Sequence, residues 1–153
     1  MKLKKILSGV LATATALVCM PVTDYAYADQ WVEGDWEYRV TYFSEDTPFD
    51  ELDVEVIKYL GKDINVVVPE KVGKHKVTGV SETFRGCADI VSITIPEGIE
   101  YINSWTFGDC TSLTSVAIPS TVNKIALGNY QIGEQNAFTW CTSLTSINVD
   151  EKN

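Results

Sequence analysis

The sequence predicts a solenoid of parallel β-strands that is covered at its N-terminal end by a β-hairpin. Three features support this prediction. Groups of apolar residues with the same spacing recur along the chain, a proline follows each of the first groups, and a Phe-x-x-Cys motif closes each unit. Pro96 and Pro119 are 23 residues apart, and so are Cys87 and Cys110. A fixed period of this length is typical of solenoids, in which each repeat is one coil that buries its apolar side against the next coil.

Residues 1–28 have the pattern of a secretory signal and lie outside the predicted fold. Three lysines precede an apolar run from Ile6 to Met20, and the tripeptide Ala-Tyr-Ala at 26–28 is a small-residue cleavage site. The apolar run is shorter than the roughly 20 residues that span a bilayer as a helix. We therefore expect an exported protein, secreted or held at the cell surface, with no transmembrane segment after cleavage.

The charge of the chain argues against nucleic acid as a partner. The full sequence has 12 Lys and Arg against 21 Asp and Glu. The leader removes three lysines and Asp24, which leaves 9 basic and 20 acidic residues and a net charge of −11. A chain with this charge is repelled by the phosphates of nucleic acids and by anionic lipid.

Residues 29–61 precede the repeats and predict the hairpin that caps the solenoid. Apolar and polar residues alternate in the segments 36–42 and 52–56, which is the pattern of half-buried strands, and a turn-rich segment from Ser44 to Asp50 joins them. Such a hairpin can cover the apolar face of the first coil. Asp50, Glu51 and Asp53 offer oxygen ligands for calcium, but their spacing is not that of an EF-hand, and a solvated acidic face is favoured.

Residues 62–153 contain the repeats, and the first of them is Ile64 to Cys87. Pro69 and Pro96 are 27 residues apart, four more than the period. The extra residues fall in the loop that holds Lys71, Lys74, His75 and Lys76, the basic cluster of the exported chain. A loop that projects from a repeat can bind a partner. A charged loop that only keeps the surface soluble is the alternative.

The strands of the repeats predict a weakly featured outer surface. Between the buried apolar positions, each strand places small uncharged side chains outward: Ser92, Thr94, Ser115, Ala117, Ser146 and Asn148. Proline ends the first strands because it has no N–H for the ladder.

An insertion of eight residues, Ala126 to Gly133, interrupts the period. It brings in Asn129, Tyr130 and Gln131, and Trp105 and Trp140 lie in neighbouring repeats. Aromatic and amide groups together suit contacts with sugars or proteins, and Trp105 with Tyr130 is predicted to form an exposed patch. The alternative is a longer turn whose Leu127 and Ile132 pack on the coil.

The exported chain keeps three cysteines, Cys87, Cys110 and Cys141, at equivalent positions of successive repeats. Equivalent positions stack in register, so a buried ladder of free thiols is favoured, with a disulfide between adjacent repeats as the alternative. No metal site is predicted, because a ladder does not converge on one point and the single His lies far away in sequence.

The last repeat ends without a capping element. Its strand, Leu144 to Val149, is followed by Asp150 where the other repeats have proline, and the sequence ends at Asn153. The repeat is therefore read as incomplete, and self-association through an open apolar coil is a further expectation.

These residues resemble the BspA-like leucine-rich-repeat family of bacterial surface proteins, whose pattern is AFxxCxxLxxIxIPxxVxxI. Residues 107–119 are close to it, 136–144 repeat it, and the resemblance covers about residues 36–153. It implies a leucine-rich-repeat solenoid of parallel strands with short helical or 3-10 turns on its back. It also implies a secreted or cell-surface setting, with adhesion to host or matrix proteins. The insertion and the ending depart from the pattern.

The predicted function is a non-enzymatic interaction or adhesion module without a cofactor, binding a host, matrix or other extracellular protein or a glycan. His75 is the single His, Ser81 lacks the second glycine of a nucleophile elbow, and no phosphate loop is present. A glycosidase would need two acids in a deep cleft, which a small solenoid does not offer. The alternative is an accessory repeat region or fragment of a larger surface-anchored protein or wall-associated enzyme.

Overall fold

The structure, a computed structural model, describes residues 30–41, 52–126 and 136–153. The predicted leader and most of the insertion lie outside these residues. The described strands are β1 (Gln30–Glu33), β2 (Trp36–Val40), β3 (Val54–Tyr59), β4 (Asn65–Val67), β5 (Lys71–Val72), β6 (His75–Val80), β7 (Ser92–Thr94), β8 (Tyr101–Ile102), β9 (Ser115–Ile118), β10 (Lys124–Ile125) and β11 (Ser146–Val149).

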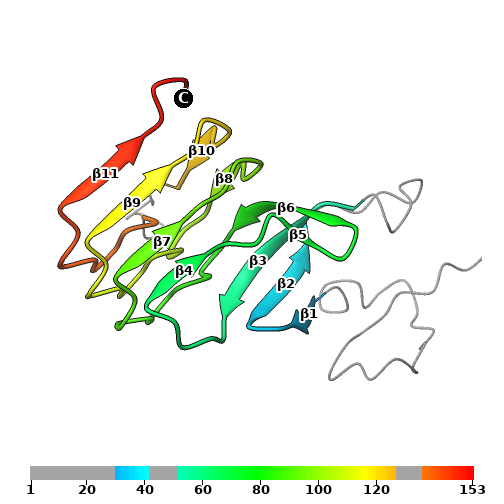
Figure 1. Ribbon diagram of the computed structural model, residues 1–153, viewed down its shortest axis with the longest axis horizontal. Coiled ribbons are helices and arrows are strands. Elements are labelled where there is room, and N and C mark those ends of the chain that lie inside the picture. Colours follow the sequence, from blue (N-terminus) through cyan, green and yellow to red (C-terminus); the bar gives the residue numbers. More distant parts are fainter. Residues whose placement is uncertain (1–29, 42–51, 127–135) are drawn as a thin grey trace, which may run out of the picture.

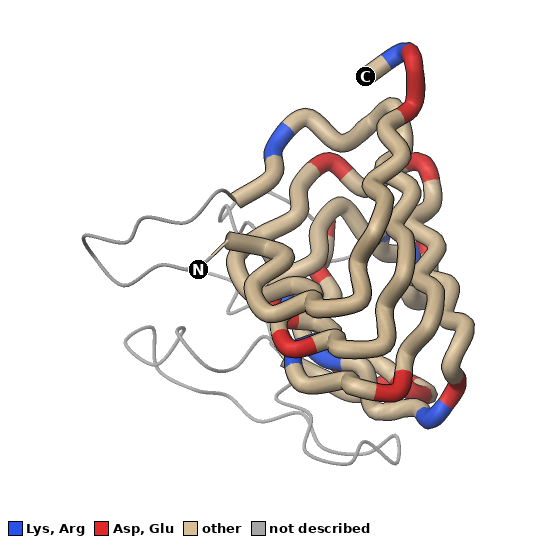
Figure 2. The backbone as a smooth tube through the Cα atoms, turned by 90° about the vertical axis from the view of Figure 1, so that its left-hand side faces the viewer, with Lys and Arg blue, Asp and Glu red and all other residues tan. Residues whose placement is uncertain are grey.

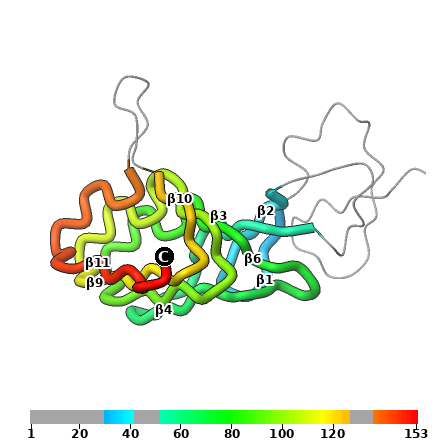
Figure 3. Tube along the Cα trace, turned by 90° about the horizontal axis from the view of Figure 1, so that it is seen from above, coloured from blue at the N-terminus to red at the C-terminus, as the bar shows by residue number. Residues whose placement is uncertain are grey.

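The strands form two sheets that face each other across the core (Figure 1). The long sheet has the order β1-β2-β3-β6-β8-β10, with β5 paired to β6, and the short sheet has the order β11-β9-β7-β4. Strands of successive coils pair in parallel, as in β7 with β9 and β6 with β8. The predicted parallel-strand solenoid is confirmed, and Figure 3 shows its coils stacked side by side from the cap to β11.

The three coils of β4 and β6, β7 and β8, and β9 and β10 each contribute one strand to each sheet. After β7 the chain turns at Pro96 and Gly98, and Gly98 has φ of +99°, a conformation that residues with a Cβ rarely adopt. The chain then enters β8, where Ile102 points into the core. Strand β8 is only two residues long. No strand was predicted there from the sequence, only apolar positions of the coil.

The third side of each coil consists of isolated turns, and the described residues contain no helix. Gly108 N donates to Trp105 O at 2.9 Å and Cys110 N to Phe107 O at 3.1 Å, which are hydrogen bonds of single turns. Alternate N–H groups bond the next coil instead: Phe107 N donates to Ala137 O at 2.8 Å. Because these N–H groups bridge coils, the short helical turns implied by the family resemblance are replaced by a hydrogen-bonded ladder of turns.

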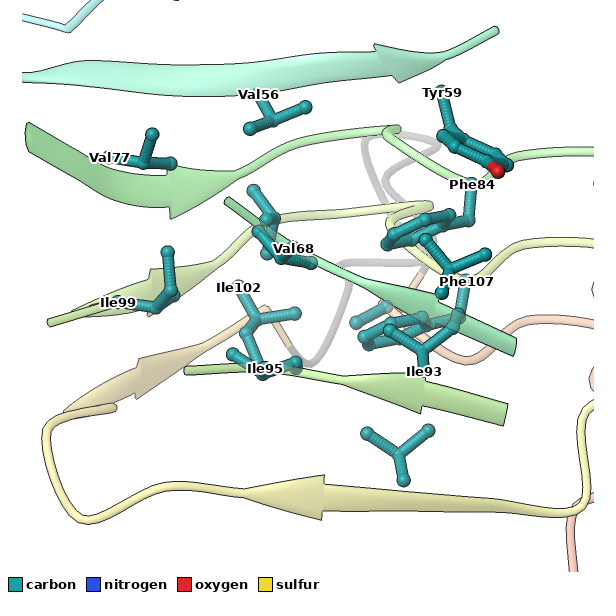
Figure 4. Packing of buried hydrophobic residues seen from close by; sticks show 14 of the residues in the cluster. Val56, Tyr59, Val68, Val77, Phe84, Ile93, Ile95, Ile99, Ile102 and Phe107 are labelled. Atoms are coloured by element: carbon teal, nitrogen blue, oxygen red, sulfur yellow. The ribbon is translucent and has the colours of Figure 1, made fainter. Parts of the chain in front are cut away.

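A column of aromatic rings runs through the core beside the turns. Phe84 and Phe107 are fully buried and nearly parallel, with centroids 6.0 Å apart. Phe138 continues the column at 4.9 Å from Phe107, and Tyr59 and Trp36 of the cap continue it on the other side. Figure 4 shows the rings of Tyr59, Phe84 and Phe107 beside the isoleucines and valines that fill the space between the two sheets.

The predicted hairpin is present and extends the long sheet. Strands β2 and β3 pair antiparallel, and β3 pairs in parallel with β6, the first long-sheet strand of the repeats. Strand β1 was not predicted; it reaches β2 through Gly34, which has φ of +60°. Its Trp31 stacks on Tyr38 with centroids 5.6 Å apart, so the cap adds aromatic surface to the core.

The last described strand leaves apolar side chains in solvent. Strand β11 pairs with β9 on one side, and its Ile147 and Val149 are exposed. Self-association through these side chains stays a prediction.

The three cysteines form the predicted ladder of unpaired thiols. The Cys110 thiol is fully buried and donates to Phe84 O at 3.1 Å, and the Cys141 thiol donates to Phe107 O at 2.9 Å. Each of these two thiols thus satisfies a carbonyl of the preceding coil. Burial, followed by the neighbouring Cys141 and Cys87, raises the pKa of Cys110 to about 12, and burial also raises the pKa of Cys87 and of Cys141.

We expect Cys110 to resist thiol reagents in the folded chain. The thiolate is the reactive form, and at pH 8 a thiol with this raised pKa is almost entirely protonated as well as covered. Reaction with iodoacetamide at pH 8, followed by mass spectrometry of the modified peptides, should label Cys110 only after guanidinium is added. Half-buried Cys87 and Cys141 should react more slowly than in the unfolded chain. Rapid labelling of folded Cys110, or recovery of a disulfide-linked peptide pair, would contradict the ladder.

Candidate functional site

A row of polar residues crosses the outer face of the long sheet, on the side away from the core. Each member is the register partner of the next, one from each of six strands: Gln30, Arg39, Glu55, Gly79, Tyr101 and Lys124. The neighbours of Glu55 on β3, Val54 and Val56, point into the core. This polar row joins the cap to three coils of the repeat region.

Glu55 is the buried charge of the row. Its side chain is almost wholly covered, with 5% of the residue exposed, and it forms an ion pair with Arg39. Arg39 Nε donates to Glu55 Oε1 at 2.7 Å, and Asn103 Nδ2 lies 3.5 Å from Oε2. The acidic residues of the cap were predicted to form a solvated face, and for Glu55 this is wrong, because Arg39 holds it on the sheet and Tyr101 extends toward it. Of the three candidate calcium ligands, Asp53 is exposed, and Asp50 and Glu51 lie outside the described residues.

Gly79 makes room for the ring of Tyr101. A Cβ placed on Gly79 would lie 2.0 Å from Cε2 and 2.1 Å from Cζ of Tyr101, so the ring lies across the bare backbone of β6. Burial, followed by the charge of Glu55, raises the pKa of Tyr101 to about 12. The ring is therefore held against β6.

An open hollow of about 330 Å³ lies over this part of the row. Glu55 and Tyr101 line it together with Thr41, Glu100, Asn103, Asn123 and Lys124. Carboxylates, amides, a hydroxyl and an aromatic ring therefore converge on one place. This site was not predicted from the sequence, although Gly79, Tyr101 and Lys124 follow one another at intervals of 22 and 23 residues, a signal that the repeat itself carries.

The basic loop predicted as a binding site is a hairpin of β5 and β6. Lys71 pairs with Lys76 and Val72 with His75, around Gly73 with φ of +57°. His75 is half-buried: its Nδ1 lies 3.1 Å from Leu52 O, and its ring meets Trp31 edge-on at 5.8 Å. His75 thus packs the hairpin against the cap. The side chains of Lys71, Lys74 and Lys76 are exposed, and binding by this loop stays a prediction.

The two predicted tryptophans differ in their surroundings. Trp105 is half-buried, and the Arg85 guanidinium lies 4.2 Å from the centre of its ring, a cation–π contact. Trp140 is 66% exposed and has φ of +63°. Asn129, Tyr130 and Gln131 lie outside the described residues, so the predicted patch of Trp105 with Tyr130 stays a prediction.

The outer face of the short sheet is flat and uncharged, as predicted. Its rows in register are Asn65, Ser92, Ser115 and Ser146, and Val67, Thr94, Ala117 and Asn148. Figure 2 shows that acidic and basic residues gather at the corners of the coils, with long uncharged stretches between them. This surface offers hydroxyl and methyl groups to a partner.

Residues 30–41, 52–126 and 136–153 contain no group of three or more His, Cys, Asp or Glu side chains that could hold a metal ion. In the same ranges no helix has the length and apolar character needed to cross a membrane.

Comparison with solved structures places the fold among bacterial leucine-rich-repeat proteins. The chain is similar to the leucine-rich-repeat protein of T. pallidum, with 26% identity and a TM-score of 0.58 over 74% of this chain and 46% of that one. A leucine-rich-repeat protein of Bacteroides ovatus matches with 22% identity and a TM-score of 0.52 over 76% of this chain and 28% of that one. One from Bacteroides capillosus matches with 19% identity and a TM-score of 0.50 over 80% and 99%.

The chain thus spans less than half of the first two neighbours, and what those whole proteins do is not transferred to it. The alternative of a repeat region within a larger surface protein stays a prediction.

No curated protein matches the chain. Residues 78–153 match the family model described as the BspA type leucine rich repeat region, in six copies. The two-sheet solenoid, the Phe-x-x-Cys ladder and this match show that the chain belongs to the BspA-type leucine-rich-repeat family.

Proposed function

We propose that this chain is an exported, non-enzymatic adhesion module that binds an extracellular protein through the outer face of its short sheet. The observation that carries the proposal is that residues 30–41, 52–126 and 136–153 cover this parallel sheet on one side only. Parallel sheets are usually buried on both faces. An uncovered parallel face built from small uncharged residues is suited to contact with a partner.

The composition of the face favours a protein as the partner. Ile64, Val67 and Val91 are exposed at the β4 end of the short sheet, and Val67 reaches 64%. Ile64 and Val91 are adjacent, because Val91 N donates to Ile64 O at 2.7 Å. Protein interfaces combine an apolar centre with a polar rim, and the serine and threonine rows supply such a rim.

Export is supported by the secretory pattern of residues 1–28 and by the bacterial family to which the chain belongs. The excess of acidic residues keeps the exported chain away from anionic lipid and nucleic acid. Both features suit a protein that meets its partner outside the cell.

The test is binding of the purified chain to immobilised fibronectin, collagen, laminin and mucin, measured by surface plasmon resonance. We expect at least one of these surfaces to retain the chain, and Ala117→Arg or Thr94→Arg to weaken that binding by about tenfold or more, because an arginine in the middle of the face blocks close approach.

Thr111→Arg is the matched control, since Thr111 is exposed on the turn side of a coil and not on the sheet. Its binding should equal that of the unchanged chain. The proposal fails if none of the four surfaces retains the chain above an empty surface, or if the sheet variants and the control bind alike.

A further inference from the structure

The hollow over the polar row has a fixed lining. Arg39 and Glu55 are paired across β2 and β3, and the Tyr101 ring lies over the bare backbone of Gly79. Groups held in this way need little ordering when a ligand arrives, which lowers the cost of binding. Asn123 and Lys124, at the rim, are exposed to solvent.

The charges of the site favour a neutral ligand. Glu55 and Glu100 carry two negative charges, and Lys124 and the adjoining Arg39 carry two positive ones. A metal cation would have to displace Arg39 from Glu55, and an anion would approach the two carboxylates. A purely apolar ligand would cover polar groups without bonding them, which costs free energy.

A neutral sugar satisfies the same groups. Sugar hydroxyls both donate and accept hydrogen bonds, so they can donate to the oxygens of Glu55 and Glu100 and bond in either sense with Asn103 and Asn123. The Tyr101 ring offers an apolar surface for the C–H groups of a sugar. The volume of about 330 Å³ is at the lower end of the roughly 300–1,000 Å³ typical of small-molecule sites, and suits a single sugar unit.

We propose that the hollow binds one neutral hexose unit of an extracellular glycan, with Tyr101 as the platform and Glu55, Asn103 and Asn123 as hydrogen-bonding partners. The site lies on the long sheet and the proposed protein-binding face on the short sheet, so the two do not depend on each other. Because the hollow is open, the glycan chain can continue beyond the bound unit.

The test is a titration of the isotope-labelled chain with maltose, cellobiose and lactose, followed by two-dimensional amide NMR. We expect at least one disaccharide to shift the amides of Gly79, Tyr101, Asn103 and Lys124 together. Tyr101→Ala should weaken the apparent affinity by about tenfold or more, while Tyr101→Phe should keep most of it, because the ring and not the hydroxyl forms the platform.

Asn123→Ala changes an exposed residue and should leave the thermal midpoint unchanged while weakening the affinity several-fold, so it decides the outcome even if Tyr101→Ala unfolds. Thr111→Ala, at an exposed turn residue away from the polar row, is the matched control and should bind as the unchanged chain does. The proposal is overturned if none of the three sugars shifts these amides. It is equally overturned if the shifts centre on Trp140, if calcium or galacturonate produces the same shifts more strongly, or if Asn123→Ala has no effect.

Discussion

Replacing Phe107 by alanine should lower the free energy of unfolding by about 3–5 kcal/mol, the cost typical of removing a fully buried phenylalanine. Its ring is completely covered and stacks on both neighbours, at 6.0 Å from Phe84 and 4.9 Å from Phe138. In a solenoid, stability is close to a sum over coils and the contacts between adjacent coils. One substitution here weakens two such contacts, and domains of this size have only about 5–15 kcal/mol in total.

Urea unfolding followed by circular dichroism measures the effect. Phe138→Ala is the first control: its ring is half-buried and contacts one described ring of the column, so the loss should be smaller. Trp140→Ala, at an exposed position, should change the stability by no more than about 0.5 kcal/mol. If Phe107→Ala costs no more than Phe138→Ala, the stacked column is not what joins the coils.

The strands of the short sheet could be predicted because their signal is local. Ile93 and Ile95 alternate with outward Ser92 and Thr94, and Pro96 ends the strand, so a few consecutive residues carry the prediction. The same holds for the cap hairpin, whose alternating residues belong to β2 and β3. Repetition at 23 residues then fixed the parallel stacking of the coils.

The long sheet was harder to predict because its repeat strands are very short. Two residues, as in β8 and β10, give no alternation to recognise, and they are strands only because neighbouring coils bond them. The turns were misjudged for a related reason: the N–H of Phe107 bonds the next coil at Ala137, a contact between residues 30 positions apart that no local pattern shows.

The hollow was not predicted because its lining comes from parts of the chain that lie far apart in sequence. Glu55 belongs to the acidic cap, and Tyr101 and Asn103 belong to the repeats; Asn103 is 48 residues from Glu55. Binding was sought where the period is interrupted, in the basic loop and the insertion. The structure adds a site inside the regular coils, where a glycine at one repeat position admits the tyrosine of the next coil.

Raising the pH above about 9 should destabilise the fold steeply, because buried acidic groups are held in their protonated form. Burial raises the pKa of Cys110 from 9.0 to about 12, and burial together with the charge of Glu33 raises that of Tyr38 from 10.0 to about 12. The unfolded chain loses these protons first, so between pH 9 and 12 it binds fewer protons than the folded chain. Stability then falls with rising pH, by up to about 1.4 kcal/mol per pH unit for each group.

Above pH 10, both groups are deprotonated in the unfolded chain and still protonated in the folded chain. The free energy of unfolding should then fall by about 2.7 kcal/mol per pH unit, enough to remove a stability of about 5–15 kcal/mol within a few pH units. Urea unfolding at pH 7, 8, 9, 10 and 10.5 should show a plateau up to about pH 8.5 and a steep fall beyond it. Burial raises the pKa of Cys87, Cys141, Tyr59 and Tyr101 in the same direction, so these groups add to the fall.

The double variant Cys110→Ala, Tyr38→Phe separates the two named groups from the rest. It removes both titrating groups while keeping the ring of Tyr38, and its stability should fall less steeply above pH 9 even if it starts lower at pH 7. Equal slopes in the two proteins would mean that neither group is held protonated by the fold. An unchanged stability at pH 10.5 in the parent chain would show that its buried thiols and phenols are open to water, and the close packing of the cysteine ladder would then not hold in solution.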